Sequence, residues 1–182
     1  MKKIFPLLLL LWVSFTPSCF KVDMKPDEPK MPPLTTEGRN TFGCYINGEP
    51  WVAEVPFGAG FSGIRKIEAR LNPLTGYFGI SAKKTNSNRS IDQNMVVAIA
   101  NIEGENVYQS YPIKLNWDEN YNCDYIFFQL DTNFIHDIDI VKFDTISKIA
   151  SGTFAYTLIN QECNDTLKVT DGRFDVRFAI VE

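Results

Sequence analysis

The 182-residue chain contains a single histidine, His136, so side chains suited to acid–base catalysis are scarce. A Ser-His-Asp triad would have to use this residue. The stretch nearest to a nucleophile elbow, residues 60–64, reads Gly-Phe-Ser-Gly-Ile and lacks the second glycine of the G-x-S-x-G pattern. We therefore expect a protein that is not an enzyme and that has no catalytic residues and no cofactor.

The chain also lacks a basic cluster and closely spaced cysteines. Its formal net charge is −4, with 18 Lys and Arg against 22 Asp and Glu. Nucleic acids and anionic lipid surfaces are bound through Lys and Arg, so we expect neither as a partner. No C-x-x-C spacing occurs among the four cysteines, and the acidic loop 117–124 has no EF-hand spacing, so we expect no metal site.

No apolar run near the N-terminus is long enough for a membrane-spanning helix, which takes roughly 20 residues. The apolar run at residues 4–15 follows Lys2 and Lys3 and precedes Thr16-Pro17-Ser18-Cys19, which is the order of regions in a secretory signal. The Ser18-Cys19 junction resembles a bacterial lipobox, with Thr16 where many lipoboxes have leucine. This resemblance implies a lipoprotein signal peptide at residues 1–18 and fatty acyl chains, such as palmitate, on Cys19. The alternatives are ordinary cleavage after Ser18 and a discarded leader.

Several acyl chains on one residue give stable anchoring, so we expect an outer-membrane lipoprotein that faces the periplasm or the cell surface. Residues 19–40 are expected to form a flexible linker, because four prolines stand among charged residues without apolar periodicity. Such a chain extends by about 3 Å per residue, which gives residues 20–38 a reach on the order of 60 Å. Loss of residues 1–18 removes two lysines and no acid, and lowers the net charge to −6.

Helical periodicity is absent from residues 41–182, where short runs of β-branched and aromatic residues alternate with turn residues. Asn47-Gly48 indicates a first hairpin. Phe174, Val176, Phe178 and Ile180 alternate with polar residues, so we expect one face of this strand in the core and Asp175 on the face toward water. Thr170-Asp171-Gly172 is expected to turn the chain before it. We expect an all-β domain, an antiparallel β-sandwich of roughly eight to ten short strands.

Two stretches at the ends of this domain resemble a domain-of-unknown-function family of Bacteroidota lipoproteins. Residues 40–51 contain Asn-Thr-Phe-Gly-Cys, Asn-Gly and a tryptophan at the family's spacing, and residues 152–154 and 170–175 contain its Gly-Thr-Phe and Thr-Asp-Gly-Arg-Phe-Asp patterns. Val169 stands where the family usually has isoleucine. The resemblance implies a small exported β domain and no established activity.

A group of aromatic residues offers the best material for a binding site. Tyr111, Trp117 and Tyr121 stand close in sequence, among asparagines and aspartates. Aromatic faces beside short polar side chains suit the apolar CH faces and the hydroxyl edges of sugars. We therefore predict a ligand-binding site at these three residues, for a glycan or an envelope protein; the alternative is that half of these aromatic residues are in the core. Trp51 is expected in the core.

The remaining cysteines and one threonine give smaller predictions. Cys44 is expected to be buried, and Cys123 and Cys163 are the favoured disulfide pair because both stand in polar, turn-like segments. Asp165-Thr166-Leu167 resembles the O-glycosylation acceptor of Bacteroidota exported proteins, as does Asp144-Thr145-Ile146, and turn exposure favours Thr166.

These observations favour a lipid-anchored binding module of the cell envelope that is not an enzyme. The second hypothesis is a structural or assembly component of the envelope. The third is an exported hydrolase that depends on His136.

Overall fold

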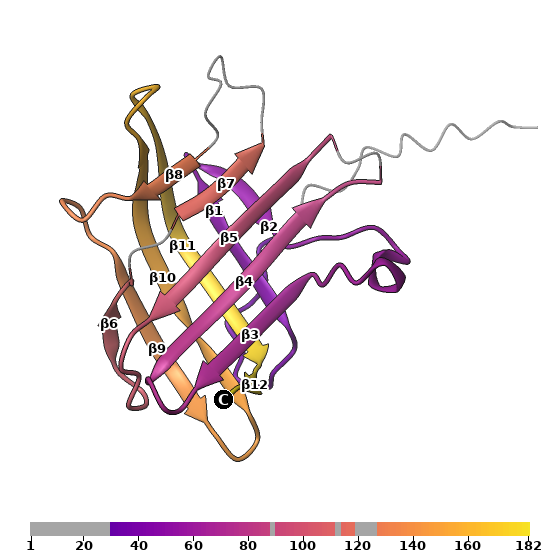
Figure 1. Ribbon diagram of the computed structural model, residues 1–182, viewed down its shortest axis with the longest axis vertical. Coiled ribbons are helices and arrows are strands. Elements are labelled where there is room, and N and C mark those ends of the chain that lie inside the picture. The colour runs from indigo at the N-terminus through magenta and orange to yellow at the C-terminus, as the bar shows by residue number, and fades with distance from the viewer. Residues whose placement is uncertain (1–29, 88–89, 112–113, 119–126) are drawn as a thin grey trace, which may run out of the picture.

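The computed structural model describes residues 30–87, 90–111, 114–118 and 127–182, and leaves out the side chains of residues 61, 62, 114–118 and 127. These residues form twelve strands and one short 3₁₀ helix (Figure 1). The elements are β1 (Thr41–Ile46), β2 (Glu49–Val52), η1 (Ala59–Ser62), β3 (Ile67–Asn72), β4 (Tyr77–Thr85), β5 (Asp92–Ile99), β6 (Val107–Gln109), β7 (Lys114–Asp118), β8 (Phe127–Leu130), β9 (Asp137–Asp144), β10 (Ile149–Asn160), β11 (Asp165–Arg177) and β12 (Ala179–Ile180).

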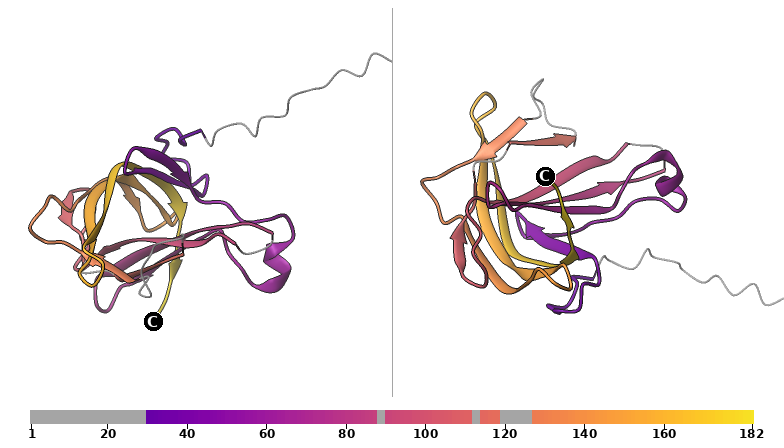
Figure 2. Two further views of the ribbon diagram at one scale, coloured as in Figure 1. Left: turned by 90° about the horizontal axis from the view of Figure 1, so that it is seen from above. Right: turned by 60° about the horizontal axis from the view of Figure 1, so that its bottom comes forward.

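The strands form two sheets that meet at β7. The larger sheet runs β7-β8-β10-β11-β1-β2, with β9 beside β10 and β6 beside β9. The smaller sheet runs β12-β3-β4-β5, and β5 pairs with β7. Among the described strands every pair is antiparallel except β12 with β3. The sheets face each other across the core (Figure 2), which confirms the predicted all-β, antiparallel sandwich.

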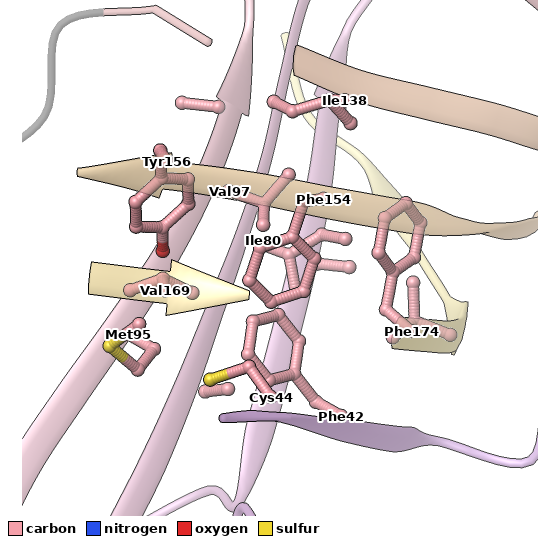
Figure 3. Close-up of a cluster of buried hydrophobic side chains, with 14 of the residues drawn as sticks. Phe42, Cys44, Ile80, Met95, Val97, Ile138, Phe154, Tyr156, Val169 and Phe174 are labelled. Carbon is pink, nitrogen blue, oxygen red and sulfur yellow. The ribbon is translucent and has the colours of Figure 1, made fainter. Parts of the chain in front are cut away.

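Large apolar side chains from both sheets fill the space between them (Figure 3). The aromatic rings of Phe42 on β1 and Phe154 on β10 lie 4.9 Å apart between centroids. Burial of each such side chain contributes roughly 1.5–3 kcal/mol relative to exposure. The predicted alternation is confirmed for Phe174, Val176 and Phe178, which are buried. Ile180 is exposed instead, because the chain leaves the larger sheet after Phe178 and pairs as β12 with β3.

Two buried polar groups of the core have partners. The predicted burial of Trp51 is confirmed, and its indole Nε1–H donates to Oε1 of Gln93 at 2.7 Å. The hydroxyl of Tyr156 donates to the carbonyl oxygen of Val96 at 2.9 Å, which joins β10 to β5. Because a buried unpaired donor costs free energy, these bonds favour one packing of the two sheets over others.

The predicted turn at Thr170-Asp171-Gly172 is wrong, because β11 continues through it from Asp165 to Arg177. Phe154 pairs with Gly172 and Tyr156 with Val169, so β11 holds one more residue than β10 between these pairs. This is a β-bulge, with Asp171 at φ 50°. An Asp-Gly pair tolerates positive φ in bulges and hairpin turns alike, so the pattern alone does not distinguish them. The chain reverses at residues 161–164 instead.

The neighbouring strands β6 and β7 pair with different partners. β6 pairs with β9, whereas β7 pairs with β5 and β8. Pro112 falls between β6 and β7 in the sequence. A proline has no N–H for a strand ladder, so the sequence favours two separate strands over one continuous strand.

Asp175 was expected to face water, and its side chain is on the outer face of β11. The residue is nevertheless 0% exposed. Residues 35–39 cover it. The Thr35 hydroxyl donates to Oδ2 at 2.6 Å, and the backbone N–H groups of Glu37, Gly38 and Arg39 donate to the same carboxylate at 3.1, 2.7 and 3.2 Å. Burial raises the pKa of Asp175, but these hydrogen bonds outweigh it and hold the pKa below its ordinary value of 3.8.

Further contacts hold the same N-terminal segment on the larger sheet. The backbone N–H of Arg177 donates to Oδ1 of Asn40 at 2.9 Å, and Nζ of Lys142 donates to the carbonyl of Thr36 at 3.3 Å. Pro32 also packs on Gly43 of β1. The C-terminal part of the predicted linker therefore contacts three strands of this sheet, β1, β9 and β11.

We predict that Asp175→Asn lowers the free energy of unfolding by about 2 kcal/mol at pH 7, because it removes a charged acceptor and places an amide N–H against backbone donors. The carboxylate has a lower pKa in the folded state. Its contribution is therefore complete above the unfolded value, about 3.9, and is lost as the pH falls through the folded value. Urea unfolding of both proteins between pH 7 and pH 3 measures this. The exposed Asp139→Asn is the control, and equal effects of the two substitutions would contradict the prediction.

Gly152 in β10 allows β9 to approach closely, since a Cβ added there would lie 2.1 Å from the carbonyl oxygen of Asp139. We predict that Gly152→Ala destabilises the protein by about 1–3 kcal/mol, because the β9 backbone must move. Gly60→Ala is the matched control, since its added Cβ meets no atom within 4 Å. Thermal unfolding of the two variants tests this, and an unchanged midpoint for Gly152→Ala would refute it.

Candidate functional site

Of the three residues predicted to bind a ligand, the structure describes the side chain of Tyr111. It is 49% exposed, and its backbone N–H donates to the carbonyl of Ala98 on β5 at 2.7 Å. Trp117 belongs to β7, where its backbone pairs with Gln93, but its side chain is outside the description. Tyr121 lies outside the described residues. The structure therefore shows the surroundings of Tyr111 alone, and ligand binding by the three residues stays a prediction.

Tyr111 lies against a second exposed tyrosine, Tyr77, which sequence reasoning missed. The two rings meet edge to face, with centroids 6.0 Å apart and an interplanar angle of 89°. Tyr77 is 38% exposed at the start of β4. Its ring lies over Gly79, where an added Cβ would be 2.9 Å from it. Tyr77 shares the outer face of β4 with residues 79, 81 and 83. An aromatic residue on this otherwise polar face is the sequence feature that could have indicated a binding residue.

A polar groove of about 660 Å³ lies on the same outer face, across β3, β4 and β5. We call it the β3–β5 groove, and it is lined by Gly63, Ile64, Arg65, Glu68, Arg70, Ser81, Lys83, Asp92 and Asn94. Arg70 pairs with Gly79, the residue beneath the Tyr77 ring. The tyrosine pair and the groove therefore form one continuous surface.

Ion pairs position the charged side chains of this groove. Oε1 of Glu68 accepts from Arg70 Nη2 at 2.6 Å and Nε at 3.1 Å, and lies 3.6 Å from Arg65 Nη1. The two arginine side chains are nevertheless 73% (Arg65) and 58% (Arg70) exposed. A guanidinium has more N–H donors than one carboxylate oxygen accepts, so both arginines still present donors to a ligand.

Neutral and charged groups complete the other side of the groove. Nζ of Lys83 lies 2.8 Å from Oδ1 of Asp92, and the Ser81 hydroxyl donates to Oδ1 of Asn94 at 2.9 Å. The Ser81–Asn94 hydrogen bond engages the side-chain oxygen of Asn94 and does not use the two N–H donors of the same amide group. The groove can thus form several oriented hydrogen bonds at fixed spacing along two strands.

A glycine-rich loop, residues 55–65, borders one end of the β3–β5 groove through Gly63 and Ile64. It contains η1 and stands away from the body of the two sheets (Figures 1 and 2). Gly58 and Gly63, at φ 84° and 75°, flank η1 in the left-handed conformation that glycine adopts without strain. Phe57 in this loop is fully exposed.

A second groove, of about 620 Å³, lies on the outer face of the larger sheet. This β9–β11 groove is lined by Leu34, Ile135, Asp137, Asp139, Thr153, Phe154, Ala155, Asp171, Gly172 and Arg173. Its charged residues are three aspartates and one arginine, so its local charge is opposite to that of the β3–β5 groove. Asp137 and Asp139 both line this groove, and Asp137 accepts a hydrogen bond from Gln109 Nε2.

His136 precedes β9, and its Nδ1 lies 2.7 Å from the carbonyl oxygen of Phe134. It lines neither groove. Within the described ranges, no group of three His, Cys, Asp or Glu residues is placed to hold a metal ion.

The structure describes both candidate glycosylation threonines and two of the four cysteines. Thr166 is an exposed residue of β11 next to the 161–164 turn, and Thr145 is exposed in the turn between β9 and β10. Cys44 is a free, buried thiol, as expected, and burial raises its pKa far above the ordinary value. Cys163 is disulfide-bonded, but Cys123, its favoured partner, lies outside the described residues, as does Cys19.

No described helix has the length and apolar character needed to cross a membrane. No family model matches the chain, and no match is found among curated proteins or solved structures. The likeness of both domain ends to Bacteroidota lipoproteins stays a prediction from sequence.

Proposed function

We propose that this protein is a lipid-anchored binding module of the cell envelope that is not an enzyme and that holds a glycan on the outer face of β3, β4 and β5. The observation that carries the proposal is the continuity of two exposed tyrosines with a polar groove. Sugars present apolar CH faces to aromatic rings and hydroxyl groups to hydrogen-bonding side chains, and this surface offers both.

The shape of the surface favours a chain of sugars over a single small molecule. From Tyr77 to Lys83 along β4 the outward side chains extend over about 20 Å, at roughly 3.3 Å per residue. The polar groups lie along this line on three adjacent strands, since Glu68 pairs with Ser81 and Lys83 with Asn94. An elongated oligosaccharide can contact the rings at one end and the charged groups at the other.

The N-terminal anchor is the second part of the proposal. Acylation of Cys19 fixes the chain to the outer membrane, and residues 20–29 separate the anchor from the segment held by Asp175. The binding face is then displayed in the periplasm or at the cell surface, where envelope or environmental glycans are accessible.

A second candidate is an assembly component of the envelope, and the β9–β11 groove favours it. Exposed Leu34 and Ile135 border this groove beside the aspartates Asp137, Asp139 and Asp171. Apolar borders with acidic groups suit an extended protein segment that carries basic residues.

We predict that Tyr77→Ala and Tyr111→Ala each weaken glycan binding by about tenfold, because an aromatic contact is worth about 1 kcal/mol beyond its buried area. A glycan array identifies the ligand for the full chain, and calorimetry then compares the variants. Phe134→Ala is the matched control, since Phe134 is 58% exposed outside the β3–β5 groove. Binding that survives both tyrosine substitutions would place the ligand elsewhere.

Anchoring is tested separately with Cys19→Ala in the producing bacterium. We expect the wild-type protein to fractionate with outer membranes and to carry acyl mass at Cys19, and the variant to lose both properties. Intact mass and membrane fractionation are the measurements. An unacylated wild-type protein would disprove the anchor without affecting the glycan site.

A further inference from the structure

We propose that the ligand of the β3–β5 groove is an acidic polysaccharide, whose carboxylate or sulfate groups bind Arg65, Arg70 and Lys83. This inference rests on the proposed glycan-binding function and specifies the chemical class of the sugar. It starts from a contrast of charge, since the chain has a net charge of −4 whereas the groove holds three cations and two anions.

The arginines are positioned for an anion that arrives from solvent. Glu68 binds Arg70 and lies near Arg65 through a single oxygen atom, Oε1, and so holds the two guanidinium groups near each other. Both arginine side chains are more than half exposed, so a ligand can approach these guanidinium groups from solvent. Planar guanidinium groups match the paired oxygens of carboxylates and sulfates better than they match a lone hydroxyl.

The rest of the groove is also rich in donors. Lys83 Nζ lies 2.8 Å from Asp92 Oδ1, and Asn94 accepts from the Ser81 hydroxyl through Oδ1, so that bond does not use the amide N–H donors of Asn94. A neutral sugar has hydroxyl groups that donate as well as accept, so it would leave part of this donor excess unused. A sugar with anionic groups along its chain supplies the missing acceptors, while Tyr77 and Tyr111 contact its ring faces.

The spacing of the cations favours a polymer with repeated charge. Arg70 pairs with Gly79 on β4, and Lys83 is four residues further along the same strand, about 13 Å away. One anionic group cannot reach both positions, whereas successive charged sugars of one chain can. The occupant we infer is therefore a polyanionic saccharide and not an isolated acidic monosaccharide.

The test uses the full chain in detergent and a pair of probes with the same sugar backbone, of which only one is charged: polygalacturonate and its methyl ester. We expect binding to the acid form to be at least about tenfold tighter, and to weaken as salt is raised from 50 to 500 mM. Dextran sulfate and dextran form a second pair. Tighter binding of polygalacturonate than of dextran sulfate identifies carboxylate as the recognised group, and the reverse order identifies sulfate. Either result supports the proposal.

Variants locate the effect. Arg70→Gln should weaken binding of the charged probe by about fivefold, and should weaken binding of the methyl ester by clearly less, because only the charged probe loses an ion pair. Lys168→Gln removes the same charge from an exposed position on β11, outside the groove, and should have little effect. Circular dichroism checks that both variants fold.

The outcomes separate this inference from the function on which it rests. Equal affinity for charged and uncharged probes, with sensitivity to Tyr77→Ala, would overturn the acidic ligand and keep the glycan site. Equal losses in Arg70→Gln and Lys168→Gln would show attraction by overall charge and would also overturn it. If no glycan of any kind binds, both the acidic ligand and the proposed glycan-binding function are overturned.

Discussion

The buried carboxylate of Asp175 is the interaction on which the rest of this structure depends. It accepts hydrogen bonds from a side chain and three backbone groups of the N-terminal segment, on the outer face of a central strand. A buried charge is tolerated only when its lone pairs are satisfied, so the segment and the strand require each other. The bond pattern fixes where residues 35–39 leave the sheet and hence where β1 begins.

The sandwich places two grooves of opposite charge on opposite sheets. Between them lies a core that joins both layers through aromatic packing and through the bonds of Trp51 to Gln93 and of Tyr156 to Val96. Because side chains of a strand alternate between its faces, the same strands that fill the core present the polar groups of each groove. The proposed binding surface is thus supported by paired strands, an arrangement that suits recognition of a ligand without large rearrangement.

Much of the fold could be predicted because strand alternation is a local signal. The period of two correctly predicted that Phe174, Val176 and Phe178 are core residues. The same rule failed at Asp175, whose burial depends on a segment more than 130 residues away in the chain. The turn predicted at residues 170–172 was wrong for a different reason, because the Asp-Gly pair that suits a turn also suits a β-bulge.

The site was less accessible to prediction than the fold. Tyr111 was found because it belongs to a cluster of aromatic residues in sequence, but Tyr77, its ring partner, is 34 positions away and meets it only through the β4–β5 pairing. The groove has the same origin, since Glu68, Ser81 and Asn94 come together only through strand register. Local patterns can suggest a type of ligand, whereas the strand order decides which residues share a face.

The contact between the N-terminal segment and β11 also has a mechanical meaning. Tension applied to the chain ahead of residue 35 reaches the carboxylate of Asp175 before it reaches the ladder of β1. Since β1 is paired on both edges, with β11 and with β2, force directed along it must slide the strand past two neighbours at once. Such shear resists extension more than the stepwise opening of a hairpin, so the domain is built to keep its shape when pulled from its N-terminal end.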